Sequence, residues 1–372
     1  MNRFPVSFPL RWILTVFTLL VLFPPERSEA QMPLRKDQPD MTIDAKTKQV
    51  ILDAVLAKLD QKYVDPAVAR SMRQAMTDRR RRNTYEAITS ASAFSDSVTE
   101  ALRAVSHDKH LRVFYRHEPI PQEERTGVPS AEERQREEEA MRLRNYGFEQ
   151  VERLRGNVGY LKLRGFMMSE QSGKAAAAAM QLLANTDALI IDLRQNGGGA
   201  GEMVQLLVTY LTKAGDPVRI TDIYSRPEDF TQQFWTLPWV PGPRYEKDVY
   251  VLTSAGTFSA AEEFTYDLQN MKRATIVGET TGGGAHPVSF ERLNEHFMLS
   301  LPYAKAVNPV SKTNWEGVGV RPDVSVPAAD ALKTAHVLAL KKIQPTLADA
   351  ALRESVAQTI ESIEKTGESR SN

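Results

Sequence analysis

Ser259 stands where chemistry is most readily placed in this sequence of 372 residues. The apolar, β-branched run at residues 249–253 is typical of a buried strand, and Phe264 and Leu268 then recur at helical spacing. The sequence therefore predicts that Ser259 lies where a strand hands over to a helix, beside backbone N–H groups without helical partners. A hydroxyl there can act as a nucleophile, and the N–H groups can stabilise an oxyanion. The same position also suits a simple helix N-cap, so both interpretations stay open.

A serine hydrolase needs more than its nucleophile. It needs a base that takes the hydroxyl proton, a group that orients the base, and N–H donors where the oxyanion develops. A glycine turn containing Gly198 and Gly199 offers such donors. Three histidines in loop or glycine-rich settings offer the base, namely His107, His110 and His286. Spacing alone does not bring these groups together, so the fold must do so.

The composition excludes several classes of function. The chain carries 47 basic and 47 acidic residues, so it has no general attraction to nucleic acid, and no nucleic-acid partner is expected. It has no cysteine, which excludes disulfides, thiolate metal sites and a cysteine nucleophile. The glycine-rich residues 196–201 lack the spacing and the Gly-Lys-Ser/Thr ending of nucleotide-binding loops. No cofactor and no metal are expected.

The first residues predict a targeting segment. Arg3 and Arg11 precede an apolar run at residues 12–23, and Ala30 is the small residue that signal cleavage prefers. The run is too short to span a bilayer comfortably, and no second such run follows. Residues 1–30 are therefore expected to be a signal peptide, with the mature protein periplasmic or secreted and without a stable membrane anchor. An uncleaved N-terminal anchor is the alternative interpretation.

Helical spacing of apolar residues dominates the first part of the mature chain. It predicts helices at residues 51–59, 67–78 and 94–105, followed by an alternating strand at residues 111–115. These elements are expected to form a small N-terminal helical domain, together with the start of the core, within residues 41–117.

The next stretch changes character twice. Residues 118–145 are charged and contain prolines, so a linker or an exposed charged helix is expected there. Within residues 146–330, strands, glycine turns and helices alternate, which indicates an α/β core with a largely parallel sheet. Strands are expected at residues 158–163, 188–193, 249–253 and 296–301. Residues 331–372 are expected to form a C-terminal helical tail.

Residues 230–245 hold several aromatic residues, prolines and glycines without periodicity. A loop is expected here, and its apolar side chains, Trp235 and Trp239 among them, must cover something. They either form a small satellite cluster under the loop or line a wall for a ligand.

Several stretches resemble motifs of one known family. Residues 192–199 (DLRQNGGG) look like the Asp-Leu-Arg-x-Asn-x-Gly-Gly motif of the tail-specific, or C-terminal processing, proteases, also called peptidase family S41. Residues 259–262 resemble the nucleophile segment of that family, and residues 108–110 its Asp-x-His segment. Residues 278–284 and 316–323 resemble its later motifs, and all stand in family order. The resemblance implies a ClpP/crotonase-like α/β core with a small N-terminal helical domain.

The branch within the family matters for the mechanism. Residues 257–264 and 282–287 look most like the branch related to interphotoreceptor retinoid-binding protein. The tail-specific branch uses a Ser–Lys dyad, but Gly284 occupies the place of that lysine here. A Ser–Lys mechanism is therefore not expected. A PDZ domain, which is common in the tail-specific branch, has no room in the short charged linker.

The related tricorn-type branch uses His and Glu with Ser, and His110 and Glu316 fall at the matching motifs. The resemblance then implies that Ser259 attacks the scissile carbonyl, His110 takes its proton, and Glu316 holds the imidazole and stabilises its cation. The oxyanion donors would be the N–H groups of Gly198 or Gly199 and of Ala260.

His286 has no assigned part in that scheme. It is a candidate for the base in place of His110, for binding the terminal carboxylate of a substrate, or for a purely structural role.

Two functions follow for the whole chain. The first is an exported serine peptidase that acts on peptide or protein substrates. The second is a non-catalytic module that binds a retinoid, a fatty acid or another apolar ligand.

Overall fold

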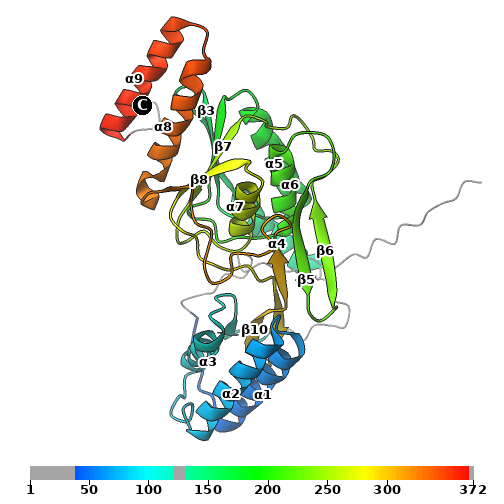
Figure 1. The fold of residues 1–372 in the computed structure, drawn as a ribbon. Helices are drawn as coiled ribbons and strands as arrows, with labels where there is room; N and C mark the ends of the chain where they lie inside the picture. The colour runs from blue at the N-terminus through cyan, green and yellow to red at the C-terminus, as the bar shows by residue number, and fades with distance from the viewer. Residues whose placement is uncertain (1–37, 121–130, 368–372) are drawn as a thin grey trace, which may run out of the picture.

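The computed structural model describes residues 38–120 and 131–367 (Figure 1). The predicted signal peptide at residues 1–30 lies outside this part of the chain. None of the helices in the described part combines the length and the apolar character needed to cross a membrane.

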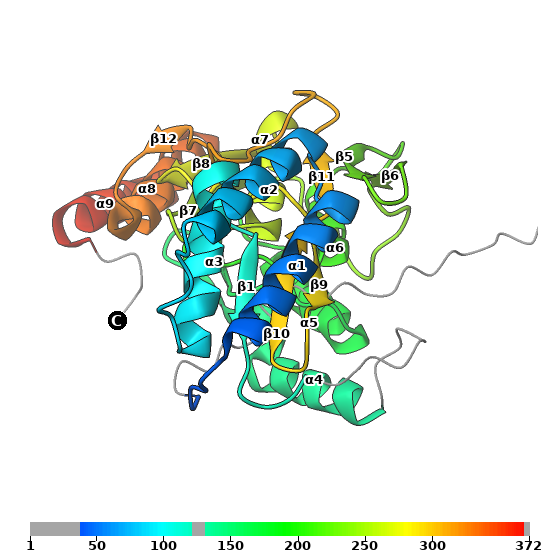
Figure 2. The ribbon, with the colours of Figure 1, turned by 90° about the horizontal axis from the view of Figure 1, so that it is seen from below.

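Three helices form the N-terminal unit, as the sequence predicts. They are α1 (Ala45–Lys62), α2 (Pro66–Arg81) and α3 (Ala91–Ser106). Each begins at a residue whose side chain accepts hydrogen bonds from the first turn, namely Asp44, Asp65 and Ser90. Figure 2 shows the three helices side by side on one end of the molecule.

Strands from two distant parts of the sequence pack against the three helices. A three-stranded antiparallel sheet has the order β1 (Arg112–Tyr115), β10 (Phe297–Pro302) and β9 (Val288–Arg292). Phe94 of α3 packs edge-on against Phe297 of β10, and both side chains are buried. The segment that leads into β1 is therefore held next to residues almost two hundred positions later.

The central sheet has six strands, in the order β12-β8-β7-β4-β3-β2. Their bounds are β2 Phe148–Leu154, β3 Val158–Leu163, β4 Ala188–Asp192, β7 Asp248–Thr253, β8 Ala274–Gly278 and β12 Val324–Ser325. Neighbouring strands are parallel throughout except for the antiparallel pair β2 and β3. The predicted α/β core with a largely parallel sheet is confirmed.

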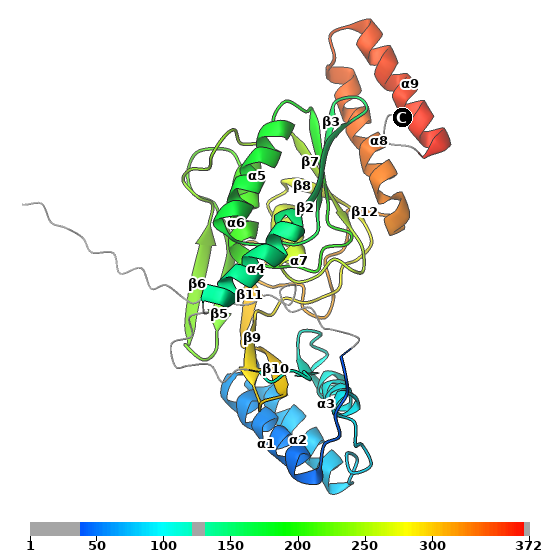
Figure 3. The same cartoon turned by 180° about the vertical axis from the view of Figure 1, so that it is seen from behind.

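Helices cover both faces of this sheet, so its strands are apolar on both sides. Val249 and Val251 of β7 face the core under the helices α5 to α7, whereas Tyr250 and Leu252 face the core under α8 and α9. The helices are α5 Glu170–Leu183, α6 Gly201–Leu211, α7 Ala260–Asn270, α8 Ala331–Ile343 and α9 Ala350–Thr366. Figure 3 shows α5 and α6 on one side of the sheet and the α8–α9 hairpin on the other.

The stretch predicted as a linker or charged helix contains α4 (Ala131–Leu143), which has no buried residue in its described positions. Its sequence is dominated by Glu and Arg, as expected for a solvated helix.

The prediction of a loop at residues 230–245 is wrong for its first part. β6 (Phe230–Trp235) pairs with β5 (Arg219–Ser225), and β11 (Ala304–Val307) completes an antiparallel sheet in the order β11-β5-β6. Side chains on both faces of β6 are largely exposed, so its sequence carries no alternating pattern that would reveal a strand. The expected covering role also fails for Trp235 and Trp239, because they are 40% and 72% exposed.

Candidate active site

Ser259 directly precedes the first residue of α7 and has an unusual backbone. Its φ is 55° and its ψ is −126°, a conformation normally left to glycine. The ordinary N-cap Ser90 has φ −75° and ψ 129° instead. A strained residue persists only where its surroundings impose it, and such residues cluster at functional sites. The N-cap interpretation alone therefore does not account for the backbone of Ser259.

The predicted glycine turn lies against this serine. A Cβ added to Gly198 would be 2.7 Å from Ser259 Cβ and 3.0 Å from the nitrogen of Ala260. The backbone N–H of Gly198 donates to Asn196 Oδ1 (2.9 Å). The turn after β4 and the start of α7 therefore approach each other as closely as only glycine permits.

Replacing Gly198 with alanine is expected to lower the free energy of unfolding by about 1–3 kcal/mol, because φ is +108° and the added methyl group would press on Ser259. Chemical denaturation measures the change. Gly197→Ala is the matched control, since a Cβ there meets no atom within 4 Å. Equal unfolding midpoints for the two variants would contradict the close approach.

His110 comes from the segment between α3 and β1 and is only 2% exposed. Its ring lies 4.5 Å from the ring of Phe258, between centroids, so the imidazole stands beside the residue before Ser259. Neither ring nitrogen has a hydrogen-bond partner among residues 38–120 and 131–367. Burial lowers the pKa of His110 to about 4, and the charge of Asp108 only partly opposes this shift. The imidazole is therefore neutral at neutral pH.

Gly284 lies close to both the imidazole of His110 and the ring of Phe258. A Cβ at this position would lie 2.5 Å from His110 Cε1 and 2.5 Å from Phe258 Cε2. A lysine at position 284 would clash with His110 and Phe258, so the packing of the site excludes the lysine of a Ser–Lys dyad at this position.

Asp108 contacts both histidines of the site. Its Oδ1 accepts the backbone N–H of His110 (3.0 Å) and lies 3.8 Å from His110 Nδ1. Its Oδ2 accepts from Tyr63 Oη (3.2 Å) and lies 2.7 Å from His286 Nδ1. Burial alone would raise the pKa of Asp108, but the hydrogen bond and charge of His286 hold it below its ordinary value.

His286 stands between two carboxylates. Its Nδ1 is 2.7 Å from Asp108 Oδ2 and 3.6 Å from Glu316 Oε2. Burial opposes the charged ring, but the hydrogen bond to Asp108 and the charge of Glu316 raise the pKa of His286 above its ordinary value. The two histidines are thus shifted in opposite directions, His110 toward the neutral form and His286 toward the cation.

Glu316 follows Trp315 in the loop before β12. Its Oε2 accepts the backbone N–H of Ala285 (2.6 Å), while its buried Oε1 has no hydrogen-bond partner in the part of the chain that the structure describes. Burial, followed by the charge of Asp108, raises the pKa of Glu316 to about 7. The resemblance places Glu316 on His110, whereas the structure puts its carboxylate beside His286.

Ser259, His110, His286 and Glu316 therefore come from four separate segments of the chain. The sequence analysis did not predict that Asp108 contacts both histidines or that Tyr63 binds it. The Asp-x-His motif could have indicated Asp108, because this residue is the first of the motif. No motif marks Tyr63 at the end of α1.

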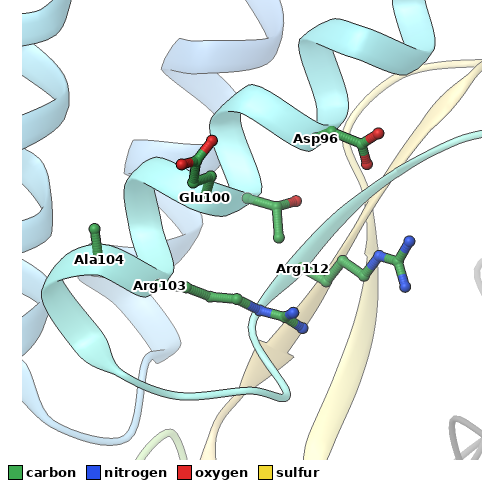
Figure 4. A pocket seen from close by; sticks show the side chains of 6 residues that line it. Asp96, Glu100, Arg103, Ala104 and Arg112 are labelled. Atoms are coloured by element: carbon green, nitrogen blue, oxygen red, sulfur yellow. The ribbon is translucent and has the colours of Figure 1, made fainter.

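Two further places have side chains that could bind a ligand. Among the described residues, Asp108, His286 and Glu316 offer one ligand atom each within 4.8 Å of one another, a set that could hold a divalent cation. A separate hollow lies on the helical unit between α3 and β1, far along the chain from Ser259 (Figure 4). Its lining residues are Asp96, Thr99, Glu100, Arg103, Ala104 and Arg112. Acidic and basic side chains balance there, and Arg103 Nε already donates to the carbonyl of Leu111 (2.8 Å).

Comparisons with known proteins place these motifs in context. The model of peptidase family S41 matches residues 157–326, and a model described as the N-terminal domain of peptidase S41 in eukaryotic IRBP matches residues 34–145. Only residues 146–156 separate the two matches, too few for a further domain.

Individual relatives agree with the family match. The carboxy-terminal-processing protease of Bartonella bacilliformis is 30% identical over 179 residues, which cover 47% of this chain and 40% of that protein. The chloroplastic carboxyl-terminal-processing peptidase 2 of Arabidopsis thaliana is 29% identical over 178 residues, covering 46% of this chain and 32% of that protein. The chain thus spans less than half the length of these relatives.

The fold is shared with solved structures. A protein from Parabacteroides merdae has a TM-score of 0.52 at 18% identity, covering 75% of this chain and 90% of that one. A lipoprotein from Streptococcus agalactiae has a TM-score of 0.50 at 14% identity, covering 84% and 100%. The predicted α/β core with a helical N-terminal region is confirmed, and the two family matches together span most of the chain. The chain belongs to peptidase family S41.

Proposed function

We propose that this protein is a serine peptidase that hydrolyses peptide bonds in peptide or protein substrates, with Ser259 as nucleophile. The observation that carries the proposal is the strained Ser259 at the start of α7, pressed against a glycine turn, with the preceding residue Phe258 packed against a buried, neutral imidazole. Family membership supports the same reading, as do relatives named as carboxy-terminal-processing proteases.

The proposed chemistry is acyl transfer. Ser259 Oγ attacks the scissile carbonyl and transfers its proton to His110, which returns it to the leaving amine. The developing oxyanion is stabilised by N–H groups at the start of α7 and in the glycine turn. Because the N–H of Gly198 already donates to Asn196, the donors we propose are those of Ala260 and Gly199.

The carboxylates supply the orientation and charge that the base requires. Asp108 binds the backbone N–H of His110 and lies beside its ring, so its charge stabilises the imidazolium formed during attack. Glu316 is proposed to act in the same network, through His286 and through its bond to Ala285 next to Gly284. His286 itself is favoured as a cation, which suits charge support or substrate binding better than proton abstraction.

The acid limb of the pH–rate profile is expected to report His110. A base must be neutral, and the pKa of about 4 keeps His110 neutral down to that pH, so kcat/KM should fall only as the pH drops toward 4. If His286 were the base, its raised pKa would place the fall above the ordinary histidine value of ~6.5. Measuring kcat/KM from acid to neutral pH, with folding monitored in parallel, decides between them. A midpoint above 6.5 would contradict the assignment.

The site of action is proposed to be outside the cytoplasm. The proposal rests on Arg3, Arg11 and the apolar run that follows them, which are typical of a signal peptide.

A second candidate function is binding of an apolar ligand without catalysis. The match of residues 34–145 to the N-terminal domain model from eukaryotic IRBP favours it, as do the exposed Trp235 and Trp239. Incubating the purified protein with a library of internally quenched peptides separates the two. The peptidase predicts serine-inhibitor-sensitive cleavage, whereas the binder predicts no cleavage and saturable binding of a retinoid or fatty acid.

A further inference from the structure

Glu262 is a fully buried carboxylate in the first turn of α7. Four donors surround it. Its Oε1 accepts from Thr281 Oγ1 (2.5 Å) and from the N–H of Gly283 (2.6 Å). Its Oε2 accepts from the N–H of Ser259 (3.0 Å) and from the N–H of Gly284 (2.8 Å). One side chain therefore joins the nucleophile to the glycine loop that follows β8.

This arrangement exceeds an ordinary helix cap. In a capping box, the third helical residue bonds only the N–H of the N-cap residue, which here is the bond to Ser259. The other three bonds of Glu262 reach residues 281–284, about twenty positions later in the chain. A carboxylate with two oxygens can satisfy all four donors, which a neutral amide cannot do.

The loop held in this way touches the rest of the site. Gly284 packs directly against the imidazole of His110 and the ring of Phe258. The next N–H, that of Ala285, donates to Glu316 Oε2 (2.6 Å). If the bonds from Glu262 were lost, residues 283–285 could shift. The packing of Gly284 against His110 and the hydrogen bond from Ala285 to Glu316 would then change, and the N–H of Ser259 would lose its partner.

We infer that Glu262 is a positioning residue. Through its four hydrogen bonds it fixes the position of Ser259 relative to the glycine loop that packs against His110. The inference rests on the proposed peptidase function and deepens it. Glu262 is 0% exposed, so it touches no substrate, and its effect must pass through Ser259 and the glycine loop.

Glu262→Gln tests the inference most directly. The amide keeps the shape, but its NH2 group would face two donors in place of an accepting oxygen. Small displacements of reacting groups can cost about 10²-fold in rate. We expect kcat and the rate of labelling by a fluorophosphonate to fall about 10²-fold, with KM unchanged within about threefold.

Asp267→Asn is the matched control. Asp267 is another fully buried carboxylate of α7, and its Oδ1 accepts only from Asn308 Nδ2 (2.8 Å), away from the glycine loop. Its pKa is raised well above its ordinary value by burial and by Glu263, so an amide replaces a group already favoured as neutral. The rate at which the fluorophosphonate labels the Asp267→Asn variant is expected to stay within about threefold of that of the parent protein. Equal losses in both variants would overturn the inference and indicate a general effect on α7.

Two further measurements keep the inference testable if Glu262→Gln folds poorly. Thr281→Val removes one of the four donors, and an intermediate fall of about tenfold in labelling rate is expected. Hydrogen exchange followed by mass spectrometry should show faster exchange of the N–H groups of residues 281–285 in the Glu262 variant, with α6 unchanged. Unchanged exchange in that loop would refute the positioning role.

These outcomes separate the inference from the proposed function. If the parent protein neither cleaves peptides nor reacts with the probe, the peptidase proposal fails, and the exchange measurement still decides whether Glu262 holds the loop. If the parent protein reacts and Glu262→Gln reacts equally fast, only the positioning role fails.

Discussion

Ser259→Ala is expected to abolish peptide cleavage and reaction with a fluorophosphonate. The variant removes the attacking oxygen but keeps the backbone, so its free energy of unfolding should stay within about 1 kcal/mol of the parent, or within about 2 kcal/mol if the hydroxyl also caps α7. Kinetic assays with chemical denaturation on the same preparation provide both values.

Ser259→Gly is the informative companion. It also lacks the oxygen, but glycine adopts φ 55° and ψ −126° without strain, so this variant should be more stable than Ser259→Ala. Turnover retained in either variant would remove Ser259 from the mechanism. A large loss of stability with unchanged specific activity would instead favour a capping role.

His110→Ala is expected to reduce kcat by at least about 10²–10⁴-fold, the usual contribution of a general base. His286→Ala should reduce it less, because the neighbouring Asp108 and Glu316 raise the pKa of His286 and so favour its charged form, which is a poor base. The comparison is made at one pH, with both variants checked for folding.

Each alternative result has a definite meaning. If only the His286 variant is inactive, the base belongs to the glycine loop and the assignment to His110 is wrong. If neither variant loses activity relative to the parent, the catalytic scheme fails.

The parallel core could be predicted from the sequence because its buried strands are short, mainly apolar runs separated by glycine turns and helical patterns. The strand predicted at residues 158–163 has those bounds in the structure, and the one predicted at 249–253 begins one residue earlier. β6 was missed because it is exposed on both faces, so only its pairing with β5 makes it a strand. That pairing leaves no periodic mark in the residues themselves.

The candidate site residues could be predicted only where they lie in motifs of the family. The turn at Gly198 and the start of α7 at Ser259 lie together, as the family resemblance implied. The contact between Asp108 and His286 joins residues 178 positions apart, and no local pattern encodes such a distance. The depressed pKa of His110 could not be foreseen either, since it follows from burial among Phe258 and Gly284.

An activated serine nucleophile reacts covalently with a fluorophosphonate, so the proposed role of Ser259 can be tested by chemical labelling. The purified protein is incubated with a fluorophosphonate at neutral pH, and the adduct is mapped by peptide mass spectrometry. We expect a single stoichiometric adduct on the peptide containing Ser259, which is lost in the Ser259→Ala variant. A folded protein that forms no adduct, or that carries it on another residue, would rule out Ser259 as the activated nucleophile.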